Sequence, residues 1–255
     1  MLNNSRYFFL FLIFSTQLLS AQTEQLRYTV YYHWGPVWID GGDLFLSYQE
    51  DVYREDTAIK LIGKGVSDSK WNWLFKVNDN YTSWCRKDDF LPLKSIKDAY
   101  EAGEKTDNNY LFDYKNLKAY IETKAGDIPV KHDTIELNKP IYDAQCATAY
   151  LRFLDFDSLQ NRDTVLLNIL LDGELYLQQF LVYKNFWLQD ESGKLHKVVK
   201  FTAVMPENKL FSSKEAIRVW VTDDEKRLPL KIKADLKVGS IEVLYNDIRF
   251  KKPQN

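Results

Sequence analysis

The stretch LRYTVYYHWGPVWIDGGDLFLSY, residues 26–48, decides the fold class of this chain. Every second position from Leu26 to Tyr32 is apolar or aromatic, and the same period of two returns at Leu44, Leu46 and Tyr48. Such alternation is typical of a β-strand with one buried face. Asp40-Gly41-Gly42 lies between the two runs and predicts the turn of a hairpin.

The same alternation continues along the rest of the chain and predicts many short antiparallel strands. The further predicted strands are Thr57–Lys64, Trp71–Val77, Tyr81–Arg86, Tyr110–Tyr114, Ala119–Thr123, Thr164–Leu171, Glu174–Tyr183, Lys197–Val204, Ala216–Thr222, Leu228–Asp235 and Ser240–Phe250. The polar stretch Asp98–Asn109 is interpreted as an exposed hairpin or loop.

One segment alone has helical spacing: Ala144, Ala147 and Leu151 recur on one face of residues 143–153, behind Pro140. We therefore expect a mainly β protein. Its antiparallel, curved sheet would be sandwich-like or barrel-like, with one short helix near 143–153.

The N-terminus predicts a signal peptide over residues 1–21. Arg6 is its only charge, and the apolar run Tyr7–Phe14 is shorter than the roughly 20 residues that span a membrane. Ala21 is the expected last residue before cleavage, which leaves residues 22–255 as a single β-rich domain without a transmembrane anchor. The alternative is a buried N-terminal strand.

Composition excludes some classes of protein. The 255 residues include 34 Lys and Arg against 36 Asp and Glu, with a formal net charge of −2. A nucleic-acid binder would normally carry a basic excess, so we expect no nucleic-acid partner.

The sequence carries no catalytic or metal-binding motif. The three histidines, His33, His132 and His196, lie far apart and match no zinc-ligand spacing, so no metal site and no cofactor are predicted. The carboxylate runs Asp88-Asp89 and Asp223-Asp224-Glu225 have two interpretations. They could perform acid–base chemistry on a glycan, or they could be solvated turns beside their Lys and Arg neighbours.

Tryptophans are the candidate ligand-binding residues. Trp71 and Trp73 are predicted to share one strand face, Trp84 follows on the next strand, and Trp187 lies elsewhere. Stacked aromatic rings could line a site for a lipid, a glycan or another amphiphile. The alternative is that the same residues fill the core of a large sheet.

The only two cysteines are Cys85 and Cys146. In an exported protein they could form a disulfide, and a loop of about 60 residues would then contribute roughly 4 kcal/mol. The alternative is two separate buried thiols.

Several segments resemble one family. They are Leu26-Arg27-Tyr28-Thr29-Val30 before Gly41-Gly42, Tyr81-Thr82-Ser83-Trp84 with Leu91-Pro92, Tyr142-Asp143-Ala144 through Tyr150-Leu151-Arg152, and Val219-Trp220-Val221-Thr222-Asp223-Asp224 with Arg227-Leu228-Pro229 and Val238-Gly239-Ser240. On these segments the chain resembles domain of unknown function 3108, an uncharacterised exported bacterial family common in Bacteroidetes.

The resemblance implies an exported, mostly antiparallel β protein of the Gram-negative envelope, periplasmic or associated with the outer envelope. It supplies no catalytic residues. The chain departs from the family at Cys146, where a small residue such as Ser or Ala is expected, so a Cys85–Cys146 disulfide would be particular to this chain.

Three functions remain open from the sequence. The leading hypothesis is an exported soluble envelope protein that binds a lipid or glycan amphiphile on the concave side of a curved sheet. The second is a structural or interaction module that pairs with another envelope protein through an open sheet edge. The third is a hydrolase that acts through Asp88, Asp223 or Asp224.

Overall fold

A computed structural model describes residues 23–73, 76–101, 103–205 and 211–247, and these residues form one large sheet and one α-helix. The prediction of a mainly β, antiparallel protein with one short helix is confirmed. The predicted signal peptide lies outside the described residues.

The sheet consists of two antiparallel meanders that share one hydrogen-bonded ladder. The first contains β1 (Thr23–Trp34), β2 (Val37–Tyr53), β3 (Asp56–Ser67), β4 (Asn78–Arg86), β5 (Pro92–Glu101), β6 (Glu104–Asp113), β7 (Lys118–Ala125) and β8 (Lys131–Glu136). The second contains β9 (Ile141–Asp143), β10 (Thr164–Leu171), β11 (Glu174–Gln189), β12 (Leu195–Val204), β13 (Ile217–Thr222), β14 (Pro229–Asp235) and β15 (Ser240–Tyr245).

The two meanders join where β1 pairs with β15, in the register Tyr28↔Tyr245. The strand order runs from β8 through β1 and β15 to β9, so the sheet does not close and β8 and β9 are its two edges. All neighbours are antiparallel except β9 and β10.

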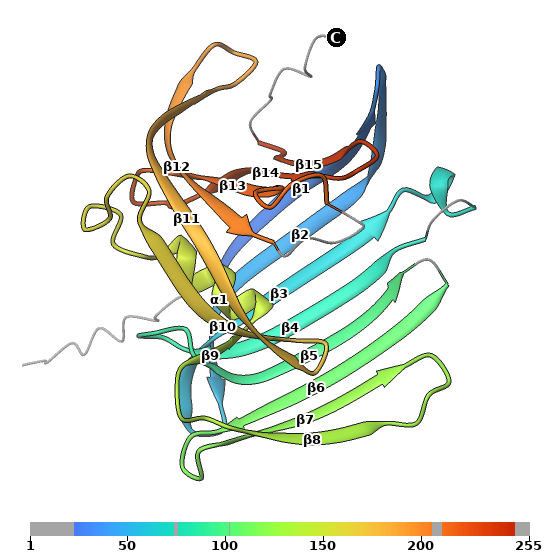
Figure 1. Ribbon diagram of the computed structural model, residues 1–255, viewed down its shortest axis with the longest axis vertical. Coiled ribbons are helices and arrows are strands. Elements are labelled where there is room, and N and C mark those ends of the chain that lie inside the picture. Colours follow the sequence, from blue (N-terminus) through green and yellow to red (C-terminus); the bar gives the residue numbers. More distant parts are fainter. Residues whose placement is uncertain (1–22, 74–75, 102, 206–210, 248–255) are drawn as a thin grey trace, which may run out of the picture.

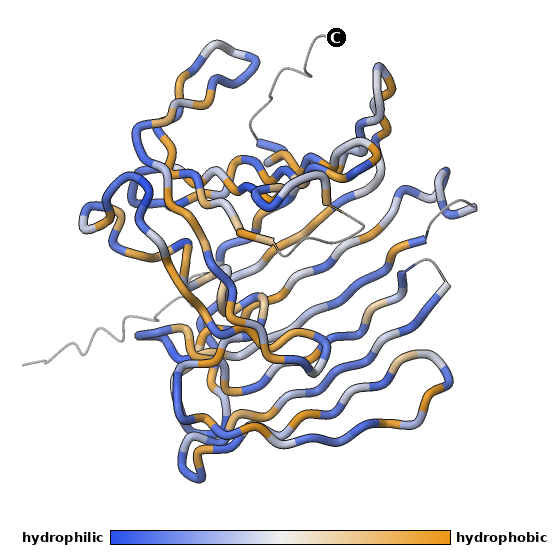
Figure 2. The backbone as a smooth tube through the Cα atoms, viewed as in Figure 1, coloured by the Kyte–Doolittle hydropathy of each residue, from blue (hydrophilic) through white to orange (hydrophobic). Residues whose placement is uncertain are grey.

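The sheet folds back on itself, so that α1 (Ala144–Arg152) and the β10–β11 hairpin lie across the strands of the first meander (Figure 1). We call the covered face of β1–β6 the inner face and the opposite one the outer face. Apolar and hydrophilic residues alternate along most strands, as expected when one face is buried (Figure 2). The largest core cluster joins Leu61 and Cys85 of the inner face to Cys146 of α1 and Val182 of β11.

Asp143 caps the N-terminus of helix α1, because its side chain accepts a hydrogen bond from the Cys146 backbone N–H at 2.8 Å. Its other end is held by Arg152, which is 2% exposed. The Arg152 guanidinium pairs with both oxygens of Glu24, at 2.6 and 2.7 Å. It also lies 4.7 Å from the Tyr48 ring centroid. These contacts fix the helix against the inner face.

The predicted turn at Asp40-Gly41-Gly42 is wrong. The β1–β2 turn is at Gly35-Pro36, where Gly35 has φ +55°, and β2 runs through residues 40–42 without a break. The β1–β2 register shifts between Val30 and Tyr31, which makes Gly41 the extra residue of a β-bulge in β2. A Cβ on Gly42 would lie 2.1 Å from the Val66 carbonyl oxygen, so this glycine permits close approach of β3.

The predicted strand Trp71–Val77 is wrong at residues 71–73, and residues 74 and 75 lie outside the described ranges. Ser69–Trp71 forms a short 3₁₀ helix, and Asn72 and Trp73 lie in the turn that follows. The Asp68 side chain accepts a hydrogen bond from the Lys70 N–H, a local bond that competes with a sheet ladder. Trp71 and Trp73 therefore do not share a strand face.

Candidate ligand-binding cavity

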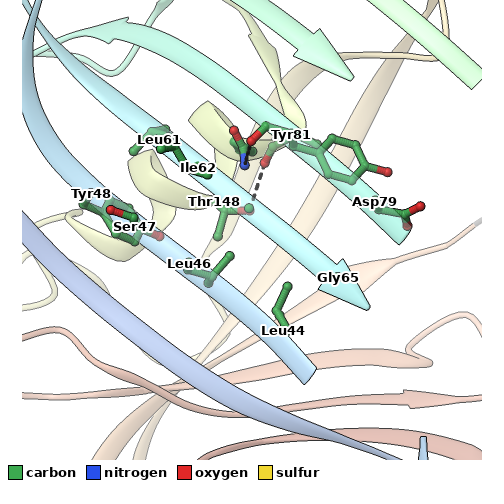
Figure 3. Close-up of a pocket in the computed structure, with 13 residues that line it drawn as sticks. Leu44, Leu46, Ser47, Tyr48, Leu61, Ile62, Gly65, Asp79, Tyr81 and Thr148 are labelled. Atoms are coloured by element: carbon green, nitrogen blue, oxygen red, sulfur yellow. Dashed lines mark hydrogen bonds between the residues drawn. The ribbon is translucent and has the colours of Figure 1, made fainter. Parts of the chain in front are cut away.

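A cavity of about 260 Å³ lies between α1 and the inner face of β2, β3 and β4 (Figure 3). Its wall is mainly aliphatic on the strands and small or polar on the helix. The lining residues are Leu44, Leu46, Ser47, Tyr48, Leu61, Ile62, Gly63, Gly65, Asp79, Tyr81, Ala144, Gln145 and Thr148.

Small residues on both walls create this cavity. Gly63 and Gly65 occupy alternate inner-face positions of β3, where they pair with Leu46 and Leu44 of β2. A Cβ on Gly63 would lie 2.6 Å from the Gln145 Nε2 atom. On the facing helix, Ala144 and Thr148 are one turn apart and present little volume.

The polar end of the cavity is formed by Asp79 and Tyr81 of β4 (Figure 3). Burial raises the pKa of Asp79 to about 6, and a hydrogen bond to the Glu101 carboxyl adds to this effect. The Tyr100 backbone N–H donates to Asp79 Oδ1 at 3.1 Å, and this hydrogen bond lowers the pKa of Asp79 in part. Burial also raises the pKa of Tyr81, so its hydroxyl stays protonated at neutral pH.

Gln145 crosses the cavity wall between α1 and β4. Its Nε2 donates to the Tyr81 carbonyl oxygen at 3.4 Å. Its Oε1 is buried and has no hydrogen-bond partner among the described residues. The cavity thus contains an acceptor that the protein itself leaves unsatisfied.

None of the four predicted tryptophans lines the cavity. Trp84 lies on the outer face, where its Nε1 donates to Asp51 Oδ2 at 3.0 Å. Trp71 donates to the Asp40 carbonyl oxygen at 2.9 Å. Trp73 is 77% exposed and Trp187, on β11, is 60% exposed. The structure does not gather these residues into one site, and the signal that sequence reasoning missed is the glycine pair within strand β3.

Cys85 and Cys146 are free thiols in the structure, and both are completely buried, one on β4 and one on α1. Burial raises the pKa of Cys146, and the neighbouring Cys85 and Asp143 raise it further. The Cys146 thiol donates to Asp143 Oδ2 at 3.3 Å. A thiol in these surroundings does not ionise readily, so it is unsuited to nucleophilic catalysis.

The carboxylates of the hydrolase hypothesis lie in turns outside the cavity. Burial disfavours ionisation of Asp223, but ion pairs with Lys197 at 2.7 Å and Arg227 at 3.1 Å outweigh it and hold the pKa of Asp223 below its usual range. Asp224 accepts a hydrogen bond from Thr222 Oγ1 at 2.7 Å. Both residues therefore stabilise the β13–β14 turn.

Comparison with known proteins places the chain among proteins of undescribed activity. A family model described as "Protein of unknown function (DUF3108)" matches residues 27–245. A similar solved structure is the beta-barrel-like protein of domain of unknown function DUF1849 from Brucella abortus. It has 8% sequence identity and a TM-score of 0.57, and the match covers 91% of this chain and 98% of that one. This likeness shows the fold alone. No curated protein matches the chain.

A search of the described ranges for membrane-spanning helices finds none of sufficient length and apolar character.

Proposed function

The chain belongs to the DUF3108 family, and we propose that it is an exported protein that binds one amphiphilic molecule between α1 and the inner face. The cavity of about 260 Å³, with its mainly aliphatic strand wall and the polar end at Asp79 and Tyr81, is the observation that carries this proposal. Binding sites for small molecules are typically concave and mostly apolar, with few polar groups that orient the ligand.

The lining residues define how the molecule would lie. Its apolar chain would contact Leu44, Leu46 and Leu61, and its polar end would lie beside Asp79 and Tyr81. Burial of apolar area supplies the driving force, at about 25 cal/mol per Å². The volume is smaller than a typical drug-sized pocket of roughly 300–1,000 Å³, which favours a single alkyl chain over a multi-chain lipid.

The open sheet edge gives less support to the alternative of an interaction module. The edge strand β8 is largely exposed, and it carries Lys131, His132 and Asp133. Charged side chains on an edge strand discourage pairing with another chain. We therefore retain amphiphile binding as the single proposed function.

Calorimetric titration with decanol, decanoate and decylamine, each below its micelle concentration, tests amphiphile binding. The wild-type protein should bind at least one of them with 1:1 stoichiometry. Leu46→Gln places an amide in the apolar wall and should weaken binding by about tenfold or more.

Phe45→Gln is the matched control. Phe45 directly precedes Leu46 in β2 but lies on the outer face, where it is 37% exposed. It should leave the affinity unchanged. Absence of binding by all three amphiphiles, or equal losses in the two variants, would refute the proposal.

Export of the protein is tested by a separate measurement. N-terminal sequencing of the protein recovered from the envelope fraction of its host should start at Gln22, after removal of residues 1–21. An intact Met1 on protein recovered from the cytosol would contradict it.

A further inference from the structure

A buried acceptor lies in the cavity wall beside Tyr81, and its identity is fixed by this neighbour. Because the Tyr81 carbonyl can only accept, the Gln145 nitrogen must face it, and Oε1 must be the atom left without a partner. A ligand group that satisfies this oxygen has to donate a hydrogen bond.

Asn108 of β6 carries a second unsatisfied acceptor on the inner face. It is reached from Tyr81 across the sheet, since Tyr81 pairs with Lys97 of β5 and Lys97 pairs with Asn108. Asn108 is 4% exposed. Its Nδ2 donates to Asp172 Oδ1 at 2.9 Å, and its Oδ1 has no partner among the described residues. The same amide geometry fixes this oxygen as an acceptor.

The charges at this end of the cavity are mainly negative. The Asp79 carboxyl, which is nearly buried, and the exposed Glu101 carboxyl are in hydrogen-bonding contact. Lys97 of β5 is the cation that faces them, and Asp172 of the β10–β11 turn already pairs with it at 2.8 Å. Tyr81 is the remaining titratable group there, and the Lys97 Nζ atom lies 5.9 Å from the centroid of its ring.

We propose that the cavity selects a cationic amphiphile, an alkylammonium whose nitrogen lies beside Asp79 and Gln145 in the cavity wall, with Glu101 in contact with Asp79 as a second source of negative charge. This inference rests on the proposed function and specifies its ligand class. An ammonium group donates up to three hydrogen bonds, and its charge is opposite to that of the Asp79 carboxylate, whereas Lys97 is already paired with Asp172. A carboxylate or phosphate headgroup would instead face two carboxyls and an acceptor oxygen.

The same three ten-carbon ligands test this selection at pH 7.5, because they differ in headgroup alone. Decylamine, an ammonium at this pH, should bind about tenfold more tightly than decanoate, with decanol between them. Asp79→Asn should weaken decylamine binding by about tenfold and change decanol binding less than about twofold. Asp51→Asn, which removes the same charge from the outer face, should change neither.

The pH dependence of decylamine binding tests the same selection in the wild-type protein. Decylamine binding should weaken from pH 7.5 to pH 5, because Asp79, whose pKa is raised to about 6, then takes up a proton and loses its charge, while decanol binding should stay constant. Equal or tighter binding of decanoate, or an unchanged preference in Asp79→Asn, would overturn the cationic selection while leaving amphiphile binding intact. Failure of all three ligands to bind would refute both.

Discussion

The two faces of strands β2–β4 use different side chains. On the outer face Arg27 lies 5.4 Å from the Phe45 ring centroid, and Lys60 lies 5.1 Å from that of Trp84. The Asp51 carboxylate on this face accepts a hydrogen bond from the Trp84 indole N–H at 3.0 Å. On the inner face leucines and glycines border a cavity, and the Gln145 oxygen is left without a partner.

This contrast shows that aromatic content does not locate the candidate site. An exposed tryptophan satisfies its N–H and covers neighbouring charged side chains on a wet surface. The cavity instead needs residues that are small or aliphatic, together with one end where polar groups lack partners. Unsatisfied acceptors, rather than large rings, distinguish the face that has room for a ligand.

The largest expected effect concerns the two thiols buried on the inner side of the fold. Refolding with oxidised glutathione should join Cys85 to Cys146, with release of two reduced glutathione molecules. The free energy of unfolding should rise by about 4 kcal/mol, since the closed loop contains about 60 residues. Urea denaturation measures the gain, and thiol titration of the unfolded protein should find no free thiol. Two titratable thiols after this treatment would contradict the pairing.

Next in size is the difference between a buried and an exposed ion pair. Arg152→Met should lower the free energy of unfolding by about 3 kcal/mol, because it leaves Glu24 and two backbone carbonyls without their donor. Arg27→Met, which removes the exposed partner of Asp43, should cost less than about 0.5 kcal/mol. Urea denaturation of both variants measures the contrast. Similar losses would show that α1 is not held in the way described.

The smallest effects distinguish two carboxylates by their response to pH. Asp79 has a raised pKa of about 6, so the folded protein retains a proton that the unfolded chain releases. Because of this retained proton, the free energy of unfolding falls as the pH rises from about 4 to 6, and Asp79→Asn should remove that decline.

Asp51 should behave in the opposite way. Hydrogen bonds from Trp84 Nε1 and the Val52 N–H lower its pKa, so its contribution is present above its unfolded pKa and is lost as the pH falls through the folded value. Asp51→Asn should therefore reduce stability at neutral pH and lessen the loss on acidification. Melting temperatures across the pH range measure both slopes, and equal slopes in the two variants would contradict the assigned environments.

Local sequence patterns predicted much of the fold. The helix follows from Ala144, Ala147 and Leu151 at helical spacing, and Asp143 caps it. The strand β8 was missed because its residues are nearly all exposed, which removes the alternation that marks a strand. The glycines at 41 and 42 were interpreted as a turn because a bulge and a turn use the same residue type.

The candidate site could not be predicted in the same way. Its two walls are β3 and α1, which are separated by about 80 residues in sequence, and no local pattern indicates that they pack together. Gly63 lies within the predicted strand Thr57–Lys64 and Gly65 directly follows it, but glycine alone does not reveal what approaches it. The buried state of Asp79 likewise depends on strands distant in sequence.

Photo-crosslinking tests most directly whether the inner face, rather than the outer, holds the ligand. A decylamine that carries a diazirine on its alkyl chain should label the cavity wall, at Leu44, Leu46 and Thr148, when the irradiated protein is digested and its peptides are sequenced by mass spectrometry. Excess unlabelled decylamine should suppress this labelling. Labelling confined to peptides that carry Trp84 or Trp187, with the cavity wall unmodified, would contradict the account.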